Sequence, residues 1–377
     1  MRIGALELFW IKMPMVGKFT TSFGTTQERE ILLVRASAGG AAGWGESGAD
    51  GVPMYSYETA ATGWHIIERF IAPVVLAEDW PEQGTATAFA ERFAGWRWHP
   101  MARGAVEEAL WVLEAERRGV SLRRLYAGER PSRNRVPVGI SLGIQDDFAV
   151  LADQIAAALD QGYRRIKLKV EPGKDVSVVE PVRERFGDIP LMVDANCGYR
   201  NDPQALEHLK ALDRFGLLMI EQPLAHDDIA AHAPLQAELA TPICLDESIH
   251  SPRHAARAID AGACRLINIK ASRLGGRAAA LAVHDLCAAR EIPVWCGGML
   301  ESGIGRLHNI ALASLPNFQM PGDLSASRRY WEQDIIDPFV EVDAEGHVAV
   351  PDTVGLGHQV VLERIEQNLV RYERFTA

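Results

Sequence analysis

From residue 136 onward, short apolar segments alternate with amphipathic stretches, and the pattern repeats about every 25 residues. The stretch at 146–162 is one example, because its apolar residues recur at helical spacing and it closes at Gly162, a residue type that suits a helix end. Strands that alternate with helices through right-handed crossovers form parallel sheets. The apolar segments therefore predict an α/β fold with a TIM-type (β/α) barrel, and they span 136–143, 164–170, 190–196, 217–223, 242–248, 265–270, 293–299 and 318–324.

A doubly wound open sheet is the alternative architecture, and it is disfavoured because no GxGxxG sequence follows the first of these segments. Residues 1–35 have the alternating pattern of strands. Helical spacing follows in three segments, 58–75, 85–95 and 102–126. These patterns predict an α+β domain over 1–130 and a barrel over 131–325. Residues 326–377 mix strand and turn patterns, and we expect them to fold back on the first domain.

Composition limits the partners of the chain. The formal net charge of −11 argues against nucleic acid, which demands a basic surface. No apolar run approaches the roughly 20 residues of a membrane helix, and the opening MRIGALELFWIKMPM lacks the features of a secretory signal. The five cysteines form no CxxC pair, which is typical of reduced thiols. We therefore expect a cytoplasmic protein that binds neither nucleic acid nor membrane.

Polar and charged side chains lie near the C-terminal ends of five successive predicted strands, where barrel enzymes carry their chemistry. In chain order these are Lys167 with Lys169, Asp194 with Asn196, Glu221, Asp246 with Glu247, and Asn268 with Lys270. Lys167 and Lys169 are two residues apart, so they share one face of a strand. Because a like charge and burial both disfavour an ammonium, we expect lysine pKa values lowered toward the range of a general base.

Three acids on three neighbouring strands need a counter-charge, since crowded carboxylates cannot all stay ionised alone. Oxygen ligands suit Mg²⁺ or Mn²⁺, so we predict that Asp194, Glu221 and Asp246 bind one such ion. Lys169 and Lys270 lie on either side of these acids. A substrate carboxylate on the metal would place its α-carbon between the two lysines. Removal of the α-proton would then give a metal-stabilised enediolate, followed by racemisation or by loss of a leaving group.

Long blocks of the sequence resemble the enolase superfamily, in the muconate-lactonizing enzyme subgroup. KLKVEPGKD, VDANCGY, IEQPLAHDD, TPICLDESI, NIKASRLGG, VWCGGMLESGIGR, ALASLPNF and PGDLSAS are similar to the o-succinylbenzoate synthase and N-succinylamino acid racemase family. The resemblance covers nearly the whole chain and implies a modified barrel of the (β/α)7β type under an N-terminal capping domain. It departs from the family at Ala271, where proline or valine is more frequent, and at Cys197, where a small hydroxyl residue is usual.

The resemblance implies roles for single residues. Lys169 and Lys270 would carry protons with Lys167 in support, and Asp194, Glu221 and Asp246 would bind the metal. The residues expected around these groups are Asn196, Glu247, Asn268 and Arg273, the last of which would tune Lys270 by like charge. Mobile capping loops at 18–24 and 48–57 would contact the substrate. The substrate-binding residues so implied are Phe19, Phe23, Met54, Tyr55, Ser141, Gly298, Met299, Leu300 and Glu301.

The implied activity is racemisation of N-succinylamino acids, with o-succinylbenzoate synthase dehydration of a menaquinone precursor as a second activity. A dipeptide epimerase or a muconate cycloisomerase is the alternative within the same fold. A metal-independent aldolase that forms a lysine Schiff base is the alternative of another class, and a barrel that only binds metal and ligand is a third. Relatives of this kind are commonly assemblies, so a homo-oligomer is expected.

Overall fold

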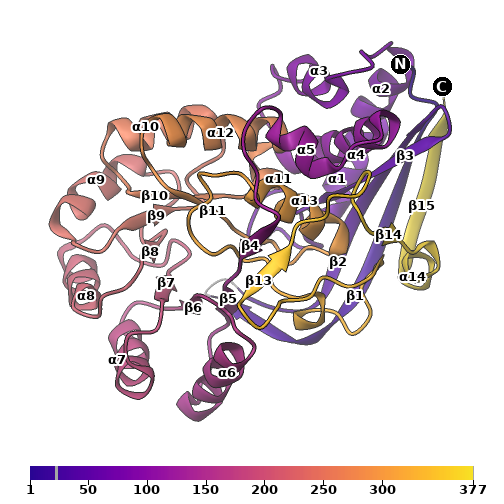
Figure 1. Ribbon diagram of the computed structural model, residues 1–377. Coiled ribbons are helices and arrows are strands. Elements are labelled where there is room, and N and C mark those ends of the chain that lie inside the picture. Colours follow the sequence, from indigo (N-terminus) through magenta and orange to yellow (C-terminus); the bar gives the residue numbers. More distant parts are fainter. Residues whose placement is uncertain (22–23, 377) are drawn as a thin grey trace.

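The computed structural model describes residues 1–21 and 24–376, and the chain forms two parts that lie side by side (Figure 1). One part is a sheet of seven parallel strands in the spatial order β11-β10-β9-β8-β7-β6-β5, which confirms the predicted α/β architecture. The strands are β5 (Ile140–Leu142), β6 (Ile166–Lys169), β7 (Leu191–Asp194), β8 (Ile220–Glu221), β9 (Ile243–Leu245), β10 (Leu266–Ile269) and β11 (Val294–Cys296). Each strand lies within one of the predicted apolar segments.

Helices follow the strands and lie outside the sheet (Figure 1). They are α6 (Phe148–Asp160), α7 (Asp175–Phe186), α8 (Pro203–Asp213), α9 (Ile229–Glu238), α10 (Pro252–Asp260), α11 (Ala271–Leu274), α12 (Arg277–Ala289) and α13 (Gly303–Ala313). Side-chain caps fix several of their starts: Asp202, for example, accepts a hydrogen bond from Ala205 N at 2.9 Å.

The eighth predicted segment, 318–324, differs from a regular strand. Phe318 forms an isolated parallel bridge with Val294, and Gly322 forms another with Val138. Pro321 lies between the two bridges and has no N–H for a continuous ladder. The segment nevertheless connects β11 to the chain just before β5, so it completes the ring of strands.

The first predicted segment, 136–143, is also interrupted. Its start, β4 (Arg135–Pro137), pairs antiparallel with β13 (His347–Ala349), and only β5 joins the barrel sheet. The break coincides with Gly139, where a Cβ would lie 2.5 Å from Cζ of Arg165. The buried guanidinium of Arg165 therefore takes the space of a side chain at this position.

The other part is an antiparallel sheet in the order β15-β1-β2-β3, with helices packed on it. The strands are β1 (Ala5–Thr21), β2 (Gly24–Ala38), β3 (Ala41–Ser47) and β15 (Leu369–Thr376). The helices are α1 (Ala60–Ile66), a π-helical turn at Ile67–Ile71, α2 (Ala72–Ala77), α3 (Thr85–Arg92), α4 (Pro100–Arg118) and α5 (Leu122–Ala127). The single helix expected over 102–126 is broken after Arg118, because Gly119 adopts φ 63° and Ser121 begins a new helix by capping Arg124 N.

The C-terminal segment crosses the barrel and returns to the N-terminal sheet, where β15 pairs with β1 (Figure 1). On the way it forms a short 3₁₀ turn (Ser327–Arg329), β12 (Ile336–Asp337), β13, β14 (Gln359–Val360) and α14 (Leu362–Gln367). The domain boundaries at 130 and 325 stay predictions.

Buried carboxylates join the two parts. Glu46 on β3 accepts hydrogen bonds from the backbone N–H groups of Ser302 and Gly305, both at 2.9 Å, at the start of α13. Glu108 on α4 forms a 2.7 Å ion pair with Arg277 at the start of α12. Burial raises the pKa of each carboxyl to about 7, although these contacts lower it. The capping part is thus fixed to the barrel by groups that have almost no contact with water.

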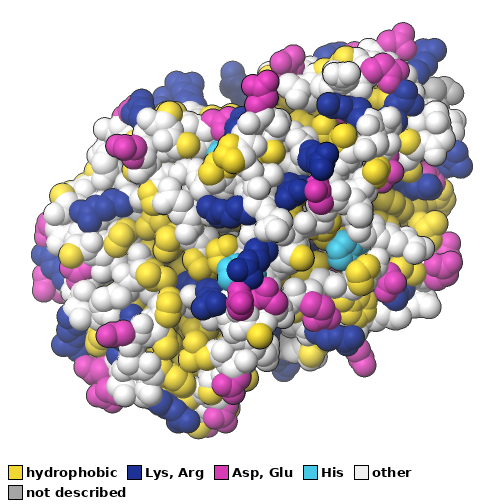
Figure 2. Space-filling model, in the orientation of Figure 1, with side chains coloured by type: hydrophobic (Ala, Val, Ile, Leu, Met, Phe, Trp, Pro, Cys, Tyr) yellow, Lys and Arg dark blue, Asp and Glu magenta, His cyan; other side chains and the backbone are white. Residues whose placement is uncertain are grey.

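Figure 2 shows Lys and Arg side chains interspersed with Asp and Glu over the visible face of the molecule. Among residues 1–21 and 24–376, no helix combines the length and the apolar character needed to cross a bilayer.

Candidate active site

Strand register places three of the predicted site residues at one level. Lys169 pairs with Asp194, and Asp194 pairs with Glu221, across the neighbouring strands β6, β7 and β8. The Nζ atom of Lys169 lies 2.6 Å from Oδ2 of Asp194 and 2.7 Å from Oδ1 of Asn196. Residues from successive strand ends therefore converge, as the barrel pattern predicts.

Lys167 is enclosed by acids rather than by like charge. Its Nζ lies 2.7 Å from Asp323 Oδ2, 3.1 Å from Glu221 Oε2 and 3.5 Å from Asp194 Oδ2, and its ammonium stands over the Trp295 ring. Burial lowers the pKa of Lys167, but the three carboxylates raise it above its ordinary value of 10.5. The expected lowering is therefore wrong for Lys167, since the acids around it outweigh desolvation.

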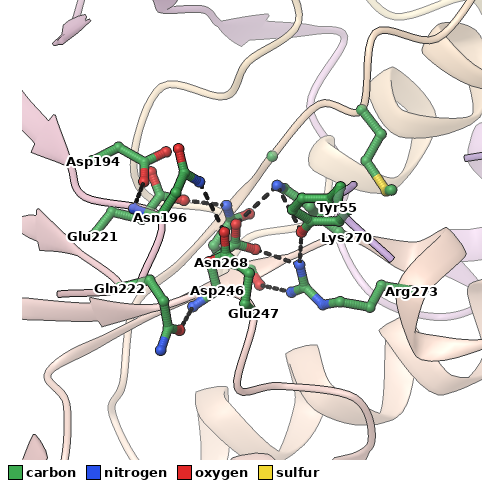
Figure 3. A network of polar contacts seen from close by, with 12 residues as sticks. Tyr55, Asp194, Asn196, Glu221, Gln222, Asp246, Glu247, Asn268, Lys270 and Arg273 are labelled. Carbon is green, nitrogen blue, oxygen red and sulfur yellow. Dashed lines mark hydrogen bonds and ion pairs between the residues drawn. The ribbon is translucent and has the colours of Figure 1, made fainter. Parts of the chain in front are cut away.

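Lys270 belongs to a second cluster, with Asp246, Arg273 and Tyr55 (Figure 3). Lys270 Nζ lies 2.8 Å from Asp246 Oδ2 and 3.1 Å from the Tyr55 hydroxyl, and it stands 4.7 Å from the centre of the Tyr55 ring. Arg273 Nη1 lies 2.5 Å from Asp246 Oδ1 and 2.6 Å from the same hydroxyl.

Neighbouring charges in this second cluster keep Asp246 and Lys270 ionised. Burial opposes ionisation of Asp246, but Arg273 and Lys270 lower its pKa below the ordinary value. Burial likewise lowers the pKa of Lys270, but Asp246 and Tyr55 raise it well above 10.5. The expected lowering is therefore wrong for Lys270 as well, and the like charge of Arg273 is only a minor influence there.

Amide side chains orient the acids. Asn268 donates to Glu221 Oε1 at 2.6 Å, and Asn196 donates to Glu247 Oε1 at 2.8 Å. Gln222 Oε1 accepts from the backbone N–H of Asp246 at 2.9 Å. Burial, followed by repulsion from Asp246, raises the pKa of Glu247 to about 7.

The backbone is strained beside these groups. Asn196, Cys197 and Gln222 adopt φ of 42°, 63° and 37°, a left-handed region that non-glycine residues rarely occupy. Such strain concentrates at functional sites.

One cavity brings the two clusters together with the capping part. Its lining includes Lys167, Lys169, Lys270 and Asn196, together with eight of the residues predicted to contact substrate: Phe19, Met54, Tyr55, Ser141, Gly298, Met299, Leu300 and Glu301. Their binding roles stay predictions, and Phe23 lies outside the described residues. The expected loop at 18–24 is different in form, because β1 continues to Thr21 and β2 begins at Gly24.

Sequence reasoning missed several cavity residues. Asp323 is the most important, because it pairs with both Lys167 and Arg165, the latter at 2.8 Å. Its signal was available, since Asp323 is the acid near the end of the last predicted strand. Arg29, Arg306 and Tyr330 also line the cavity, and their distance in sequence from the strand ends gave no local signal.

The acids can be tested as a metal site by their chemistry. In the part of the chain that the structure describes, no three His, Cys, Asp or Glu side chains are grouped as a metal site. Lys167 contacts both Asp194 and Glu221, and Lys270 engages Asp246. The donors still fit a hard cation, because they are buried carboxylate oxygens at the ends of the adjacent strands β7, β8 and β9.

Two families match the chain in succession. The mandelate racemase / muconate lactonizing enzyme N-terminal domain matches residues 7–126, and the enolase C-terminal domain-like family matches residues 150–364. The chain belongs to the enolase superfamily. Enzymes of this superfamily use a lysine or histidine base together with one or two Mg²⁺ ions.

Named relatives within the superfamily are similar over almost the full length. An o-succinylbenzoate synthase of Geobacillus stearothermophilus is 49% identical over 368 residues, 97% of this chain and 94% of the relative. An N-succinylamino acid racemase of an Amycolatopsis species is 48% identical over 371 residues, 97% of each chain. A solved structure of an enolase superfamily member from Listeria innocua superposes with a TM-score of 0.94 at 36% identity, covering 100% of this chain and 99% of the other. The fold and the family resemblance predicted from the sequence are thus confirmed.

Proposed function

We propose that this enzyme removes the α-proton of a small carboxylate substrate, with Lys169 and Lys270 as the two proton carriers. One observation carries the proposal. The two ammonium groups line the same cavity, and they reach it from opposite sides of the strands that bear Asp194, Glu221 and Asp246. A substrate between them would present opposite faces of its α-carbon to the two lysines. One lysine can then remove a proton while the other returns one from the opposite face.

The surrounding residues hold these lysines in place. Asn196 Oδ1 and Asp194 fix the ammonium of Lys169, and the Tyr55 hydroxyl and Asp246 fix that of Lys270. Lys167, which carboxylates keep as a cation, supplies fixed positive charge beside the substrate. A divalent ion, Mg²⁺ or Mn²⁺, would be held by Asp194, Glu221 and Asp246, where it would offset their charge and stabilise negative charge on a substrate carboxylate.

The substrate class follows from the named relatives. The proposed main reaction is N-succinylamino acid racemisation, and dehydration to o-succinylbenzoate is proposed as a second activity. Both activities are included because relatives with each of these names are nearly equal in identity to this chain. The metal-free aldolase alternative fits less well, because the chain matches the enolase C-terminal domain-like family and its named relatives are synthases and racemases. We also propose that the enzyme works in the cytoplasm as a homo-oligomer.

A kinetic panel tests the substrate class. Wild-type enzyme with Mg²⁺ would be assayed on N-succinylamino acids, dipeptides, muconate and the precursor of o-succinylbenzoate. We expect the highest kcat/KM on a succinyl compound and its loss in Lys270→Ala. Lys12→Ala is the matched control, because Lys12 is an exposed lysine on the N-terminal sheet that forms a 2.8 Å ion pair with Glu28. A clear preference for dipeptides or muconate would contradict the proposed substrate class.

A further inference from the structure

A strained stretch of backbone forms one wall of the cavity. Gly298 to Glu301 follow β11 and line the cavity, and Leu300 adopts φ 58°. That conformation is unfavourable for a residue with a Cβ, so the surroundings must hold it. Part of the support is local, because Glu301 Oε2 accepts a hydrogen bond from Met299 N at 2.9 Å. Arg306 and Trp331 donate to the Glu301 carbonyl at 2.9 and 3.2 Å.

Support from the capping part comes from Arg29, on strand β2. Arg29 Nη2 donates to the Met299 carbonyl at 3.2 Å and to the Gly48 carbonyl at 2.7 Å. Arg29 Nη1 lies 2.6 Å from Asp50 Oδ2. The side chain is only 5% exposed, so these contacts are shielded from water. One planar guanidinium thus bonds both to the cavity wall and to the base of the capping loop.

The predicted loop 48–57 lies within the segment 48–59, which ends at the cap of α1 and is called the capping loop here. Its base, at Gly48 and Asp50, is fixed by hydrogen bonds. Gly48 N donates to Ser272 Oγ of the barrel at 2.8 Å, and Ala60 N donates to the Asp50 carbonyl at 2.8 Å. A Cβ at Gly48 would lie 2.9 Å from Met299 Sδ, so the loop base touches the wall directly. Farther along the same loop, the Tyr55 hydroxyl lies between Lys270 and Arg273 (Figure 3).

We propose that Arg29 is a positioning residue that sets the capping loop against the wall at 298–301 and, through Tyr55, places the ammonium of Lys270. The assignment of Lys270 rests on the proposed function, whereas the coupling of loop and wall does not. Arg29 contacts Gly48, Met299 and Asp50, and in this proposal it acts on Lys270 through the loop that carries Tyr55. Its loss should therefore misplace catalytic groups without removing any of them, and a small misplacement can cost up to about 100-fold in rate.

Arg29→Met tests the proposal, because methionine fills similar space but makes none of the three polar contacts. Arg35→Met is the matched control: Arg35 is on the same strand, and its ion pair with Glu7 at 3.1 Å lies outside the cavity lining. Backbone hydrogen exchange of peptides covering 48–59 and 296–305 is measured by mass spectrometry, together with kcat and KM. We expect faster exchange in both peptides and a kcat lowered by about 10- to 100-fold in Arg29→Met only.

Two variants keep the test decisive. Arg29→Lys retains the charge for Asp50 but lacks the planar fork that bonds the Gly48 and Met299 carbonyls together. Compared with Arg29→Met, it should therefore recover folding stability more fully than kcat. If Arg29→Met does not fold, Asp50→Ala loosens the same loop base from a partly exposed position and should raise exchange in 48–59. Unchanged exchange in both segments of a folded Arg29→Met variant would overturn the proposal. If no substrate turns over, the proposed function fails and the exchange result still decides whether Arg29 couples loop and wall.

Discussion

Replacing Asp323 with asparagine removes one charge from a buried cluster while keeping the shape of the side chain. Asp323 pairs with Lys167 at 2.7 Å and with Arg165 at 2.8 Å, and both cations are almost completely buried. Removing one partner of a buried pair costs about 3–5 kcal/mol, because it leaves an uncompensated charge. Lys167 keeps Glu221 and Asp194, so we expect a loss near the lower limit, about 3 kcal/mol of unfolding free energy.

The pH dependence of this loss has a definite sign. Burial opposes ionisation of Asp323, but Lys167 and Arg165 hold its pKa below the ordinary 3.8. The carboxylate therefore stabilises the fold above the pKa that it has in the unfolded chain, and this contribution fades as pH falls toward the lower folded pKa. The difference in unfolding free energy between wild type and Asp323→Asn should therefore have its full size at pH 7 and become smaller in acid.

Urea unfolding followed by tryptophan fluorescence measures the loss at pH 7. Asp260→Asn is the control, because Asp260 forms a 2.8 Å pair with Arg290 on the surface, where such pairs contribute about 0–1 kcal/mol. Equal effects of the two substitutions would refute the idea that Asp323 compensates buried cations. We also expect Asp323→Asn to lower kcat, since Lys167 loses the acid nearest to it.

Three further predictions concern the cavity and the junction. Tyr55→Phe removes the hydroxyl that contacts Lys270 and Arg273; hydrogen bonds to charged groups contribute about 1.5–3 kcal/mol, so kcat should fall by about tenfold or more. Glu46→Gln should flatten the pH dependence of stability: burial raises the Glu46 pKa from 4.5 to about 7, so the folded chain binds a proton there and stability falls as pH rises through that window. If this is wrong, the melting temperature would change with pH between 4 and 8 in the same way in wild type and in Glu46→Gln. Chelation should abolish turnover and Mg²⁺ or Mn²⁺ should restore it, whereas full activity after exhaustive chelation would favour the lysine aldolase.

The sequence predicted the elements whose signals are local. Strand ends such as VDAN and LDES place their acids by the two-residue period of a strand, so Asp194 and Asp246 could be assigned to one rim without a structure. The places where a strand or helix is interrupted were harder to predict. Pro321 in the last barrel segment and Gly119 after α4 are both visible in the sequence, but their effect depends on packing that a pattern does not describe.

The sequence did not predict which charged residues from distant parts of the chain would contact the site. The expected lowering of the Lys167 pKa counted the neighbouring lysine but not Asp323, which is 156 residues away in the chain yet 2.7 Å away in space. Arg29 was missed for the same reason, since its contacts to Gly48 and Met299 join three distant segments. Local patterns show which residues share a face, whereas pKa values depend on every charge that the fold brings near.

Exchange of the α-proton with deuterated solvent tests the central claim most directly. Each enantiomer of an N-succinylamino acid would be incubated with wild type, Lys169→Ala and Lys270→Ala in the presence of Mg²⁺. Because the lysines approach from opposite sides, we predict that each variant loses exchange with one enantiomer and that the two variants lose opposite ones. Wild-type exchange of both enantiomers by both variants would contradict the assignment of Lys169 and Lys270 as proton carriers.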